Sequence, residues 1–354
     1  MDYLKIGIKS IAKKIGIDLI GFTSAKDFEN IRPYIDDRAQ KGFLSGFEEE
    51  NIEKRLDPLK AFPKAKSIIS IGMSYNFYVD KPPKNKFTGI VSKSAWGKDY
   101  HRVLQGKIKE LMENVNKELL PIDYIAFVDT GPLSDRAIAH RAGLGRYGKN
   151  GFIINPKYGS WIFLGSILID KKIQEDEPLE DDICKSCNLC IQACPTGALE
   201  GPYLFNASKC ISFLTQKKGI LTHNQQKALG TNIYGCDICQ QVCPYNKNAQ
   251  YTHNESFKPE FHLAFPKLEY ILNMSNKEFD EGFKTTSAGW RGKKILQRNA
   301  IIAAGNTKNY KLLAESLKDS RPDIRLNTIC VLKQLGKPGR EIIEKRTSEK
   351  HRER

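Results

Sequence analysis

Residues 184–195, CKSCNLCIQACP, decide how this sequence is interpreted. Their four cysteines follow the spacing C-x2-C-x2-C-x3-C-P, which binds iron–sulfur clusters in two-cluster electron carriers, where the fourth cysteine ligates the other cluster. A second run, CDICQQVCP at 236–244, has the same C-x3-C-P ending but lacks the first cysteine, because Ile233 stands at that position. Cys210 lies between the two runs and can supply the missing thiolate.

A requirement of four thiolates for each cluster leads to one assignment of the cysteines. Cluster 1 takes Cys184, Cys187, Cys190 and Cys243, and cluster 2 takes Cys194, Cys210, Cys236 and Cys239. A pair of zinc sites is the alternative, since zinc accepts C-x2-C spacing, but the two C-x3-C-P runs are better suited to [4Fe–4S] clusters. This clustering favours metal over disulfides. We expect the ninth cysteine, Cys330, to be a buried core residue.

The chain has 354 residues, of which 40% are apolar, and a formal net charge of +15. Its length and composition predict two or three domains with proper hydrophobic cores. No run of about 18 apolar residues occurs, so we expect no membrane span. The first 22 residues predict an amphipathic helix that leads into a strand, without an export signal. We therefore expect a cytoplasmic protein, and we expect it to be a monomer.

The pattern of residues predicts an α+β protein in three consecutive segments. Residues 1–175 alternate helical and strand-like stretches and predict a mixed α/β domain. Residues 176–250 predict a bacterial ferredoxin-like two-cluster domain, and residues 251–354 are mostly helical. In the first segment we expect strands at 67–75, 124–130 and 161–170, and helices at 98–119 and 133–145.

The acidic stretch 174–182, QEDEPLEDD, is interpreted as a linker. In the third segment RNAIIAAG and ICVLKQLG recur after 31 residues, which suits paired-helix solenoid repeats, although a simple helical hairpin explains them equally well. Residues 291–354 contain 17 Lys and Arg against 7 Asp and Glu. That excess is compatible either with solubility or with a polyanionic partner.

The first segment should hold the acceptor of the electrons, but the common nucleotide motifs are missing. No GxGxxG follows a strand, no GxxxxGK[ST] occurs, and the DxHxxG signature of histidine-ligated cobalamin is absent. Val128-Asp129-Thr130-Gly131 instead ends an expected strand, and a glycine-rich loop follows at 143–151. Such a loop lets a large flat cofactor approach the backbone closely. Asp129 is either a functional acid at this loop or the start of an Asx turn.

Several long motifs resemble the epoxyqueuosine reductase family, nearly end to end. They are GFLSGFEEENIEKR (42–55), SAWGKDYH (94–101), VDTGPLSDRAIAHRAGLG (128–145), KCISFLTQKKG (209–219), YGCDICQQVCPYNK (234–247) and SAGWRGKKILQRNA (287–300). The resemblance implies reduction of epoxyqueuosine to queuosine at the wobble position of tRNA, by cob(I)alamin that two [4Fe–4S] clusters supply with electrons. It also implies base-off cobalamin, which fits the missing DxHxxG, an external low-potential electron donor, and tRNA substrates with a GUN anticodon.

The resemblance also implies roles for single residues. Asp129 matches the proposed proton donor, and we expect burial beside the corrin ring to raise its pKa. His101 and His140 could relay protons, although an ordinary hydrogen-bonded or surface role is the more usual one for a histidine. The implied cobalamin contacts are Arg55, Ser92, Asp129, Ile153, Leu164, Ser212 and Asp237.

The resemblance implies that the basic C-terminal segment is a HEAT-like helical tRNA-binding domain. Trp290 and its neighbours combine a stacking aromatic ring with cations, as RNA-binding patches do. The residues expected to contact tRNA are Lys218, Arg291, Lys293, Lys294 and Arg298. A reductive dehalogenase-like enzyme acting on a small electrophile is the alternative, but it would need neither the basic tail nor tRNA.

Overall fold

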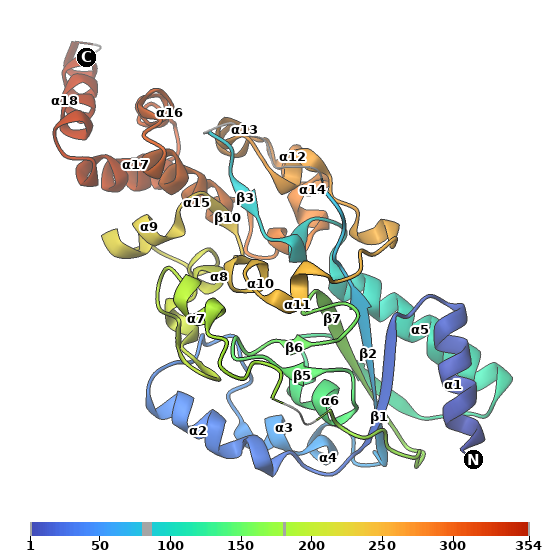
Figure 1. Cartoon of the computed structure of the whole chain (residues 1–354). Helices are drawn as coiled ribbons and strands as arrows, with labels where there is room; N and C mark the ends of the chain where they lie inside the picture. Colours follow the sequence, from blue (N-terminus) through green and yellow to red (C-terminus); the bar gives the residue numbers. More distant parts are fainter. Residues whose placement is uncertain (1, 80–86, 180–181, 353–354) are drawn as a thin grey trace. The chain divides into compact units, whose positions relative to one another are not determined.

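The structure, a computed structural model, describes residues 2–79, 87–179 and 182–352. They form two compact units, each assembled from three separate stretches of the chain (Figure 1). Unit 1 comprises Met1–Tyr78, Tyr100–Ser208 and Ile238–Ser256, and unit 2 comprises Val79–Asp99, Lys209–Asp237 and Phe257–Arg354. These two compact units do not coincide with the three consecutive segments predicted from the sequence. The three segments remain our proposal for how functions are distributed along the chain.

Unit 1 is built on a four-stranded antiparallel sheet. Its strands lie in the order β1 (Leu19–Ser24), β2 (Ser67–Ser74), β7 (Ile162–Ile169) and β4 (Tyr124–Phe127). Every residue of β2 is buried, as expected of a central strand that is covered on both faces. The strands predicted at 67–75 and 161–170 are confirmed, and the one predicted at 124–130 ends three residues earlier.

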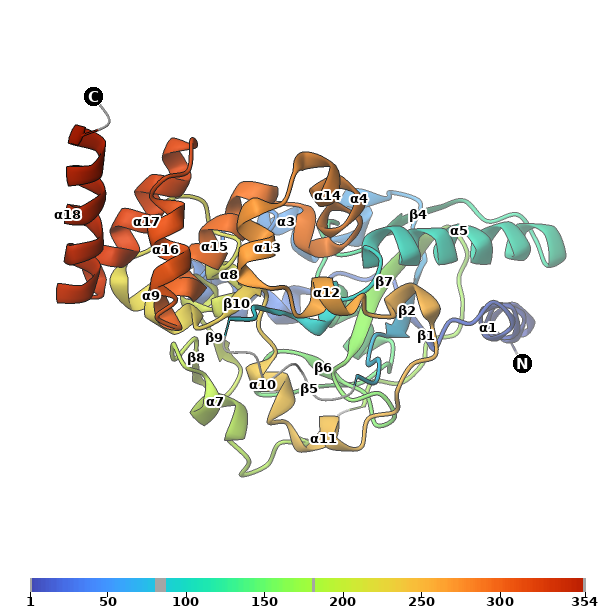
Figure 2. The same ribbon diagram turned by 90° about the horizontal axis from the view of Figure 1, so that it is seen from above.

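Helices cover both faces of this sheet. On one face, a Cβ added at Gly165 would contact Ile71 and also Ile108 of α5 (Tyr100–Glu118). On the other face, a Cβ at Gly72 would contact Leu144, just after α6 (Asp135–Arg141). Adjacent strand residues point to opposite faces, so α5 and the α6 region lie on different sides. The helix α1 (Tyr3–Lys14) packs against α5 and is seen end-on in Figure 2, where α5 is seen along its length.

The remaining elements of unit 1 are short and lie mostly in the loops that carry the cysteines and glycines. The pairs β5–β6 and β8–β9 are antiparallel. These elements are α2 (Arg32–Gln40), α3 (Ile52–Leu56), α4 (Pro58–Ala61), β5 (Arg146–Tyr147), β6 (Ile153–Ile154), α7 (Leu189–Ala193), β8 (Leu199–Gly201), β9 (Leu204–Phe205), α10 (Ile238–Gln241) and α11 (Pro244–Lys247).

The acidic stretch interpreted as a linker is held against unit 1, so that prediction was wrong for its described part. One carboxylate oxygen of Asp176 lies 2.8 Å from Lys5 Nζ, and the other accepts the backbone N–H of Phe22 at 3.1 Å. Glu175 accepts the backbone N–H of Ser24, also at 3.1 Å. The acids therefore pair with cations of α1 and with the free edge of β1. Residues 180–181 lie outside the described residues.

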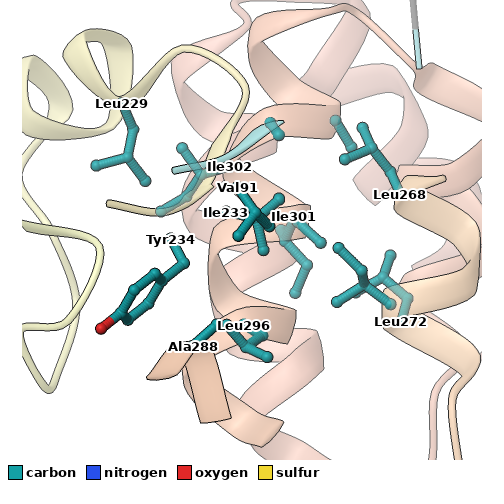
Figure 3. Close-up of a cluster of buried hydrophobic side chains, with 14 of the residues drawn as sticks. Val91, Leu229, Ile233, Tyr234, Leu268, Leu272, Ala288, Leu296, Ile301 and Ile302 are labelled. Carbon is teal, nitrogen blue, oxygen red and sulfur yellow. The ribbon is translucent and has the colours of Figure 1, made fainter. Parts of the chain in front are cut away.

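Unit 2 has its own hydrophobic core, built around the parallel pair β3 (Ile90–Val91) and β10 (Asn232–Tyr234). Side chains from both strands and from the helices α13 (Leu268–Asn273) and α15 (Lys293–Asn306) converge there (Figure 3). Ile233 is fully buried, and a Cβ added at Gly89 would come within 2.4 Å of it. Ile233, which stands where the second cysteine run lacks its first cysteine, is therefore a core residue of unit 2.

The rest of unit 2 is helical, and no described helix of the chain is long and apolar enough to cross a membrane. The elements are α8 (Ile211–Leu214), α9 (His223–Leu229), α12 (Phe261–Ala264), α13 (Leu268–Asn273), α14 (Asn276–Glu281), α15 (Lys293–Asn306), α16 (Tyr310–Ser316), α17 (Pro322–Gln334) and α18 (Lys337–Arg352). Short 3-10 turns complete the described chain: η1 (Glu29–Ile31), η2 (Lys93–Ala95), η3 (Ala207–Lys209), η4 (Glu255–Phe257), η5 (Phe283–Thr285) and η6 (Ser287–Gly289).

The two similar sequence segments fall in α15 and α17, which pack against each other (Figure 1). A HEAT-like repeat remains a proposal for them. Cys330 of α17 is partly exposed, contrary to our expectation. The buried side of α17 is formed by Ile324, Thr328, Val331 and Leu332, and Cys330 lies beside this stripe rather than within it.

Candidate active site and cluster-binding region

Asp129 follows β4 at a sharp turn of the backbone. Its φ is 59°, in the left-handed region, which aspartate tolerates better than most residues. Tyr100 Oη donates to Asp129 Oδ2 at 2.8 Å, and His101 Nε2 lies 3.5 Å from the same oxygen. The Asp129 side chain is 66% exposed. Two neighbouring residues of α5 thus hold an acid that is open to solvent and to a ligand.

The groups of the protein itself lower the pKa of Asp129, while the increase expected from burial beside a corrin ring stays a prediction. The hydrogen bond with His101 is the largest cause, and desolvation acts against it. The Tyr100 hydrogen bond and the charges of His101 and Arg136 also lower it. Hydrogen bonds to a carboxylate favour its charged form. The residues around Asp129 therefore stabilise its carboxylate form. A rise in its pKa would have to come from a bound group.

A column of stacked aromatic rings supports these two donors. Tyr75 stacks on Phe163 of β7 with ring centroids 4.2 Å apart, and Phe163 stacks on Tyr100 at the same separation. Tyr100 in turn stacks on His101 at 4.0 Å. Tyr75 and Phe163 are buried, so the column is anchored in the sheet. Stacking fixes the directions in which Tyr100 and His101 present their polar atoms.

A second acid, Asp135, holds the backbone of Asp129. Asp135 is the first residue of α6, and its Oδ2 accepts the Asp129 N–H at 3.1 Å while Oδ1 accepts the hydroxyl of Ser166 at 2.5 Å. Burial raises the pKa of Asp135 to about 7, and the charge of Asp129 adds to this increase. Sequence reasoning missed this role, because it placed Asp135 only near the start of the helix expected at 133–145. Ser134 is the residue that caps α6.

We expect Asp135→Asn to change how stability depends on pH. Between the ordinary aspartate pKa near 3.9 and about 7, the folded chain keeps a proton that the unfolded chain has lost. Stability therefore falls as pH rises through this window, by about 4 kcal/mol in total. The midpoint of thermal unfolding of the variant, relative to the natural chain, should thus be higher at pH 8 than at pH 5.

The exposed Asp123 provides the control for this measurement, because Asp123→Asn removes a carboxylate that is 64% exposed. A relative stability of Asp135→Asn that did not vary between pH 5 and pH 8 would contradict the buried, protonated state of Asp135.

The proposed ligands of cluster 1 all belong to unit 1. Burial raises the pKa of the Cys243 thiol, and the charges of Cys184 and Cys187 raise it further. Burial likewise raises the pKa of Cys190, with contributions from Cys184 and Cys243. The four sulfurs therefore lie within electrostatic range of one another. Among the described residues, no group of three or more His, Cys, Asp or Glu side chains lies close enough together to bind a single metal ion.

The proposed ligands of cluster 2 come from both units, with Cys194 and Cys239 in unit 1 and Cys210 and Cys236 in unit 2. Burial alone would raise the pKa of Cys194, but backbone N–H groups of Leu199 and of its other neighbours lower it overall. N–H donors directed at sulfur stabilise the thiolate that a cluster requires. The assignments of cysteines to cluster 1 and to cluster 2 both stay predictions.

The residues expected to contact cobalamin are also divided between the units. Ser92 and Asp237, both buried in unit 2, contact each other, since Ser92 Oγ donates to Asp237 Oδ1 at 2.5 Å and the Lys93 N–H donates to Oδ2 at 2.8 Å. Burial raises the pKa of Asp237. Gly235 has a φ of 70° and a Cβ there would lie 2.4 Å from that of Ser92, so only glycine fits.

The other expected cobalamin contacts differ in accessibility. Ile153 of β6 is 2% exposed, while Leu164 of β7 and Arg55 of α3 are partly buried, all in unit 1. Ser212 is partly buried in α8 of unit 2, and its carbonyl accepts the hydroxyl of Thr215. Asp129, the remaining one, has the exposed carboxylate described above.

Arg298 is buried at 4% exposure, which contradicts the tRNA phosphate contact predicted for it. Its guanidinium donates to the carbonyl of Lys217, to that of Gly219 at 3.0 Å and to that of Leu214 at 2.9 Å. Burial lowers the pKa of Arg298 to about 10, so it stays charged near neutral pH. Its role in unit 2 is to organise the loop after α8, on which Lys217 and Lys218 are exposed.

The other basic residues expected to contact tRNA remain at the surface of unit 2. The ring of Trp290 is 53% exposed, and the guanidinium of Arg291 lies 4.6 Å from its centroid. Lys294 is 80% exposed. Lys293 is partly engaged, since its Nζ donates to Asn276 Oδ1 at 2.6 Å. Arg291 is also partly engaged, since its Nε donates to the carbonyl of Gln216 at 2.9 Å, so Lys218 and Lys294 stay the stronger candidates.

We expect Arg298→Ala to destabilise the protein by about 3 kcal/mol, because several buried carbonyls would lose their donor. A lower midpoint of chemical unfolding would show this effect. Lys294→Ala is the matched control, since it removes a positive charge from the surface of the same helix and should leave stability within about 0.5 kcal/mol. Equal stability of both variants would contradict the structural role of Arg298.

Two known protein families match parts of the chain. The "4Fe-4S double cluster binding domain" matches residues 183–246, which contain all eight clustered cysteines, and "Epoxyqueuosine reductase QueG, DUF1730" matches residues 55–130. The epoxyqueuosine reductase of Lactococcus garvieae is 42% identical over 327 residues, which cover 92% of this chain and 93% of that protein. The chain belongs to the epoxyqueuosine reductase family. The matched region 55–130 includes Arg55, Ser92 and Asp129.

Solved epoxyqueuosine reductases share this mixed α/β fold. One, with a tRNA-Tyr epoxyqueuosine-modified tRNA stem loop, has a TM-score of 0.91 at 42% identity and covers 97% of this chain and 93% of that chain. Another, from Bacillus subtilis, has an aspartate catalytic loop swung out of the active site; its TM-score is 0.91 at 41% identity, with 97% and 93% coverage. The epoxyqueuosine reductase of Escherichia coli is 32% identical over 86% of this chain and 82% of that protein.

Proposed function

We propose that this chain reduces epoxyqueuosine to queuosine at the wobble position of tRNA. The observation that carries the proposal is the similarity, over nearly the whole chain, to an epoxyqueuosine reductase that was solved with an epoxyqueuosine-modified tRNA stem loop. The reaction opens the epoxide and removes its oxygen as water, so that two electrons and two protons convert the epoxide to an alkene. The protein must therefore deliver single electrons and protons to the same epoxide.

Two [4Fe–4S] clusters would deliver the electrons, since the matched double-cluster domain contains all eight cysteines. In our proposal cluster 1 is held by the cysteines of unit 1 that share an electrostatic environment, and the remaining four cysteines hold cluster 2. An external low-potential donor would reduce them, because [4Fe–4S] clusters transfer one electron at a time.

Cobalamin is the proposed centre of reduction. When bound, it supplies a cobalt ion that can be reduced by single electrons and can attack an electrophilic carbon. The residues present fit such a group: Leu164 offers apolar surface, while Ser212 and the Ser92–Asp237 pair offer polar partners for the amides at the rim of a corrin ring. Each Asp237 oxygen accepts one hydrogen bond from the protein and has the capacity for another.

Asp129 is the proposed proton donor at the oxygen released from the epoxide. Its carboxyl group is exposed, and Tyr100 and His101 contact it from the side of the aromatic column. Since these residues favour the carboxylate, the proton must reach Asp129 during the reaction, and His101 is placed to pass it on. The aspartate catalytic loop in the Bacillus subtilis structure supports this role for the Asp129 loop.

The basic surface of unit 2 is proposed to bind tRNA with a GUN anticodon. Trp290 offers an exposed ring for stacking, and Arg291, Lys294 and Lys218 offer positive charge for phosphates. By function we divide the chain into a cobalamin-binding catalytic segment (1–175), a two-cluster segment (176–250) and a HEAT-like tRNA-binding segment (251–354), in a cytoplasmic monomer.

The proposed function is tested by reconstituting the protein without oxygen, with cobalamin, a low-potential reductant and tRNA that carries epoxyqueuosine. Nucleoside mass spectrometry of the digested tRNA should show a loss of one oxygen mass that requires both cobalamin and the reductant. If both clusters are intact and cobalamin is bound but the oxygen is retained, the proposal fails, and small electrophiles such as organohalides become the next candidates.

A further inference from the structure

Lys149 is a buried lysine that the reaction described above does not use. It follows β5 in the glycine-rich loop and is 7% exposed. Its Nζ donates to the carbonyl of Lys185 at 2.6 Å, to the carbonyl of Cys187 at 3.1 Å and to Asn188 Oδ1 at 3.1 Å. These acceptors occupy all three hydrogens of the ammonium group. A lysine is rarely buried unless its charged group is paired or hydrogen-bonded.

All three acceptors belong to the loop that carries the first C-x2-C pair. The backbone N–H of Lys149 also lies 3.4 Å from Cys184 Sγ, and the Cys187 N–H donates to the Cys184 carbonyl at 2.7 Å. Lys185 has a φ of 42°, in the left-handed region, which is uncommon for a residue other than glycine. Lys149 therefore holds the two cysteines, and the strained residue between them, in one arrangement.

The charge of Lys149 is placed to act on a cluster. A [4Fe–4S] cluster with four thiolates carries net negative charge, and both nearby charge and hydrogen bonds to sulfur set its reduction potential. The hydrogen bond from the Cys184 N–H is the largest cause of the lowered pKa of Asp182; the hydrogen bond from the Tyr203 hydroxyl and the charge of Lys149 contribute less. The short contacts of the ammonium group are made to carbonyl and amide oxygens of the cysteine loop.

We propose that Lys149 is a positioning residue for cluster 1, which preorganises the C-x2-C loop and raises the reduction potential of the cluster. The proposal rests on the cysteine assignment of the proposed function. Lys149 lies outside residues 55–130 and 183–246, the regions matched by the two families, so neither description accounts for it. A higher potential stabilises the reduced cluster, because the positive charge offsets the added electron.

The test compares variants of the full-length protein with reconstituted clusters and without tRNA. Lys149→Met removes the charge and the donors, Lys149→Gln removes the charge but keeps a donor, and Lys149→Arg keeps the charge. Potentiometric titration followed by electron paramagnetic resonance measures each cluster. For Lys149→Met we expect the ratio of reduced to oxidised cluster 1 at a fixed potential to fall about tenfold, equivalent to about 59 mV for one electron, with cluster 2 unchanged.

Lys149→Gln should shift the potential in the same direction, and Lys149→Arg should stay near the natural protein. The neighbouring Lys185 provides the control: its side chain is exposed, so Lys185→Met removes a charge beside the same loop that solvent already screens. Loss of cluster 1 from Lys149→Met but not from Lys149→Arg, measured as iron content, would also support the proposal.

An unchanged potential in a fully loaded Lys149→Met protein would overturn the proposal. So would equal shifts in Lys149→Arg and Lys149→Met, because the charge would then have no part in the effect. These results are separate from the proposed function, since conversion of epoxyqueuosine by the natural protein is measured by nucleoside mass spectrometry.

Discussion

Asp129→Asn should lower the rate of epoxyqueuosine reduction by about 10²–10⁴-fold while both clusters remain and tRNA still binds. Asparagine has nearly the same shape as aspartate and can still accept the hydrogen bond that Tyr100 donates to Oδ2. It has no acidic proton to give to the oxygen that leaves the epoxide. The measurement is single-turnover conversion of modified tRNA by the reconstituted protein.

Tyr100→Phe is the matched companion to this variant, because it removes one donor to Asp129 and keeps the aromatic stack with Phe163. The Tyr100 hydrogen bond lowers the pKa of Asp129, so its loss should raise that pKa. Activity limited by the protonated acid should then extend to higher pH than in the natural protein. If Asp129→Asn turned over at the natural rate, Asp129 would be excluded as the proton donor.

Replacing Cys243 by alanine should abolish turnover and remove one cluster. Because each cluster contains four iron atoms, the iron content should fall from about eight to about four per chain. Cys184→Ala should remove the same cluster as Cys243→Ala, although 58 residues of sequence separate the two cysteines, since the thiols already influence each other's environment in unit 1. Iron analysis and the electron paramagnetic resonance spectrum identify which cluster remains.

Cys236→Ala is the informative comparison, because Cys236 and Cys243 belong to the same sequence run but to different proposed clusters. The two variants should retain different clusters, each with its own spectrum. Cys330→Ala is the control and should keep both clusters, since Cys330 lies in α17, away from the cysteine runs in the sequence. Loss of the same cluster from Cys236→Ala and Cys243→Ala would contradict the crossed assignment.

Local patterns predicted much of the fold. The buried strands β2 and β7 and the amphipathic helix α5 all depend on neighbouring residues, and each was found near its expected position. The acidic stretch around Asp176 could not be interpreted in this way. Its charges looked like those of a solvated linker, but their partners lie more than 150 residues earlier in the sequence.

The same limit applies to the candidate site. Arg298 belongs to a basic stretch that looks the same whether its side chains face phosphates or the protein's own carbonyls, and only the fold of unit 2 decides between them. Asp135 was visible as a residue near a helix start, but its bond to the Asp129 N–H depends on the turn between β4 and α6. Lys149 had no sequence signal, because its acceptors are mainly backbone carbonyls.

The interleaving of the two units affects how the chain can be synthesised. At about 5–20 residues per second, β10 is made on the order of ten seconds after its partner β3. Val91 of β3 is 1% exposed in the folded unit, and it can become buried only after β10 has been made. Unit 2 also takes a third stretch from residues that follow β10, Phe257–Arg354, so its core cannot be completed until these residues have been made as well. The apolar side chains of the second core therefore stay without their partners for several seconds during synthesis, and a chaperone that shields apolar segments would act during that interval.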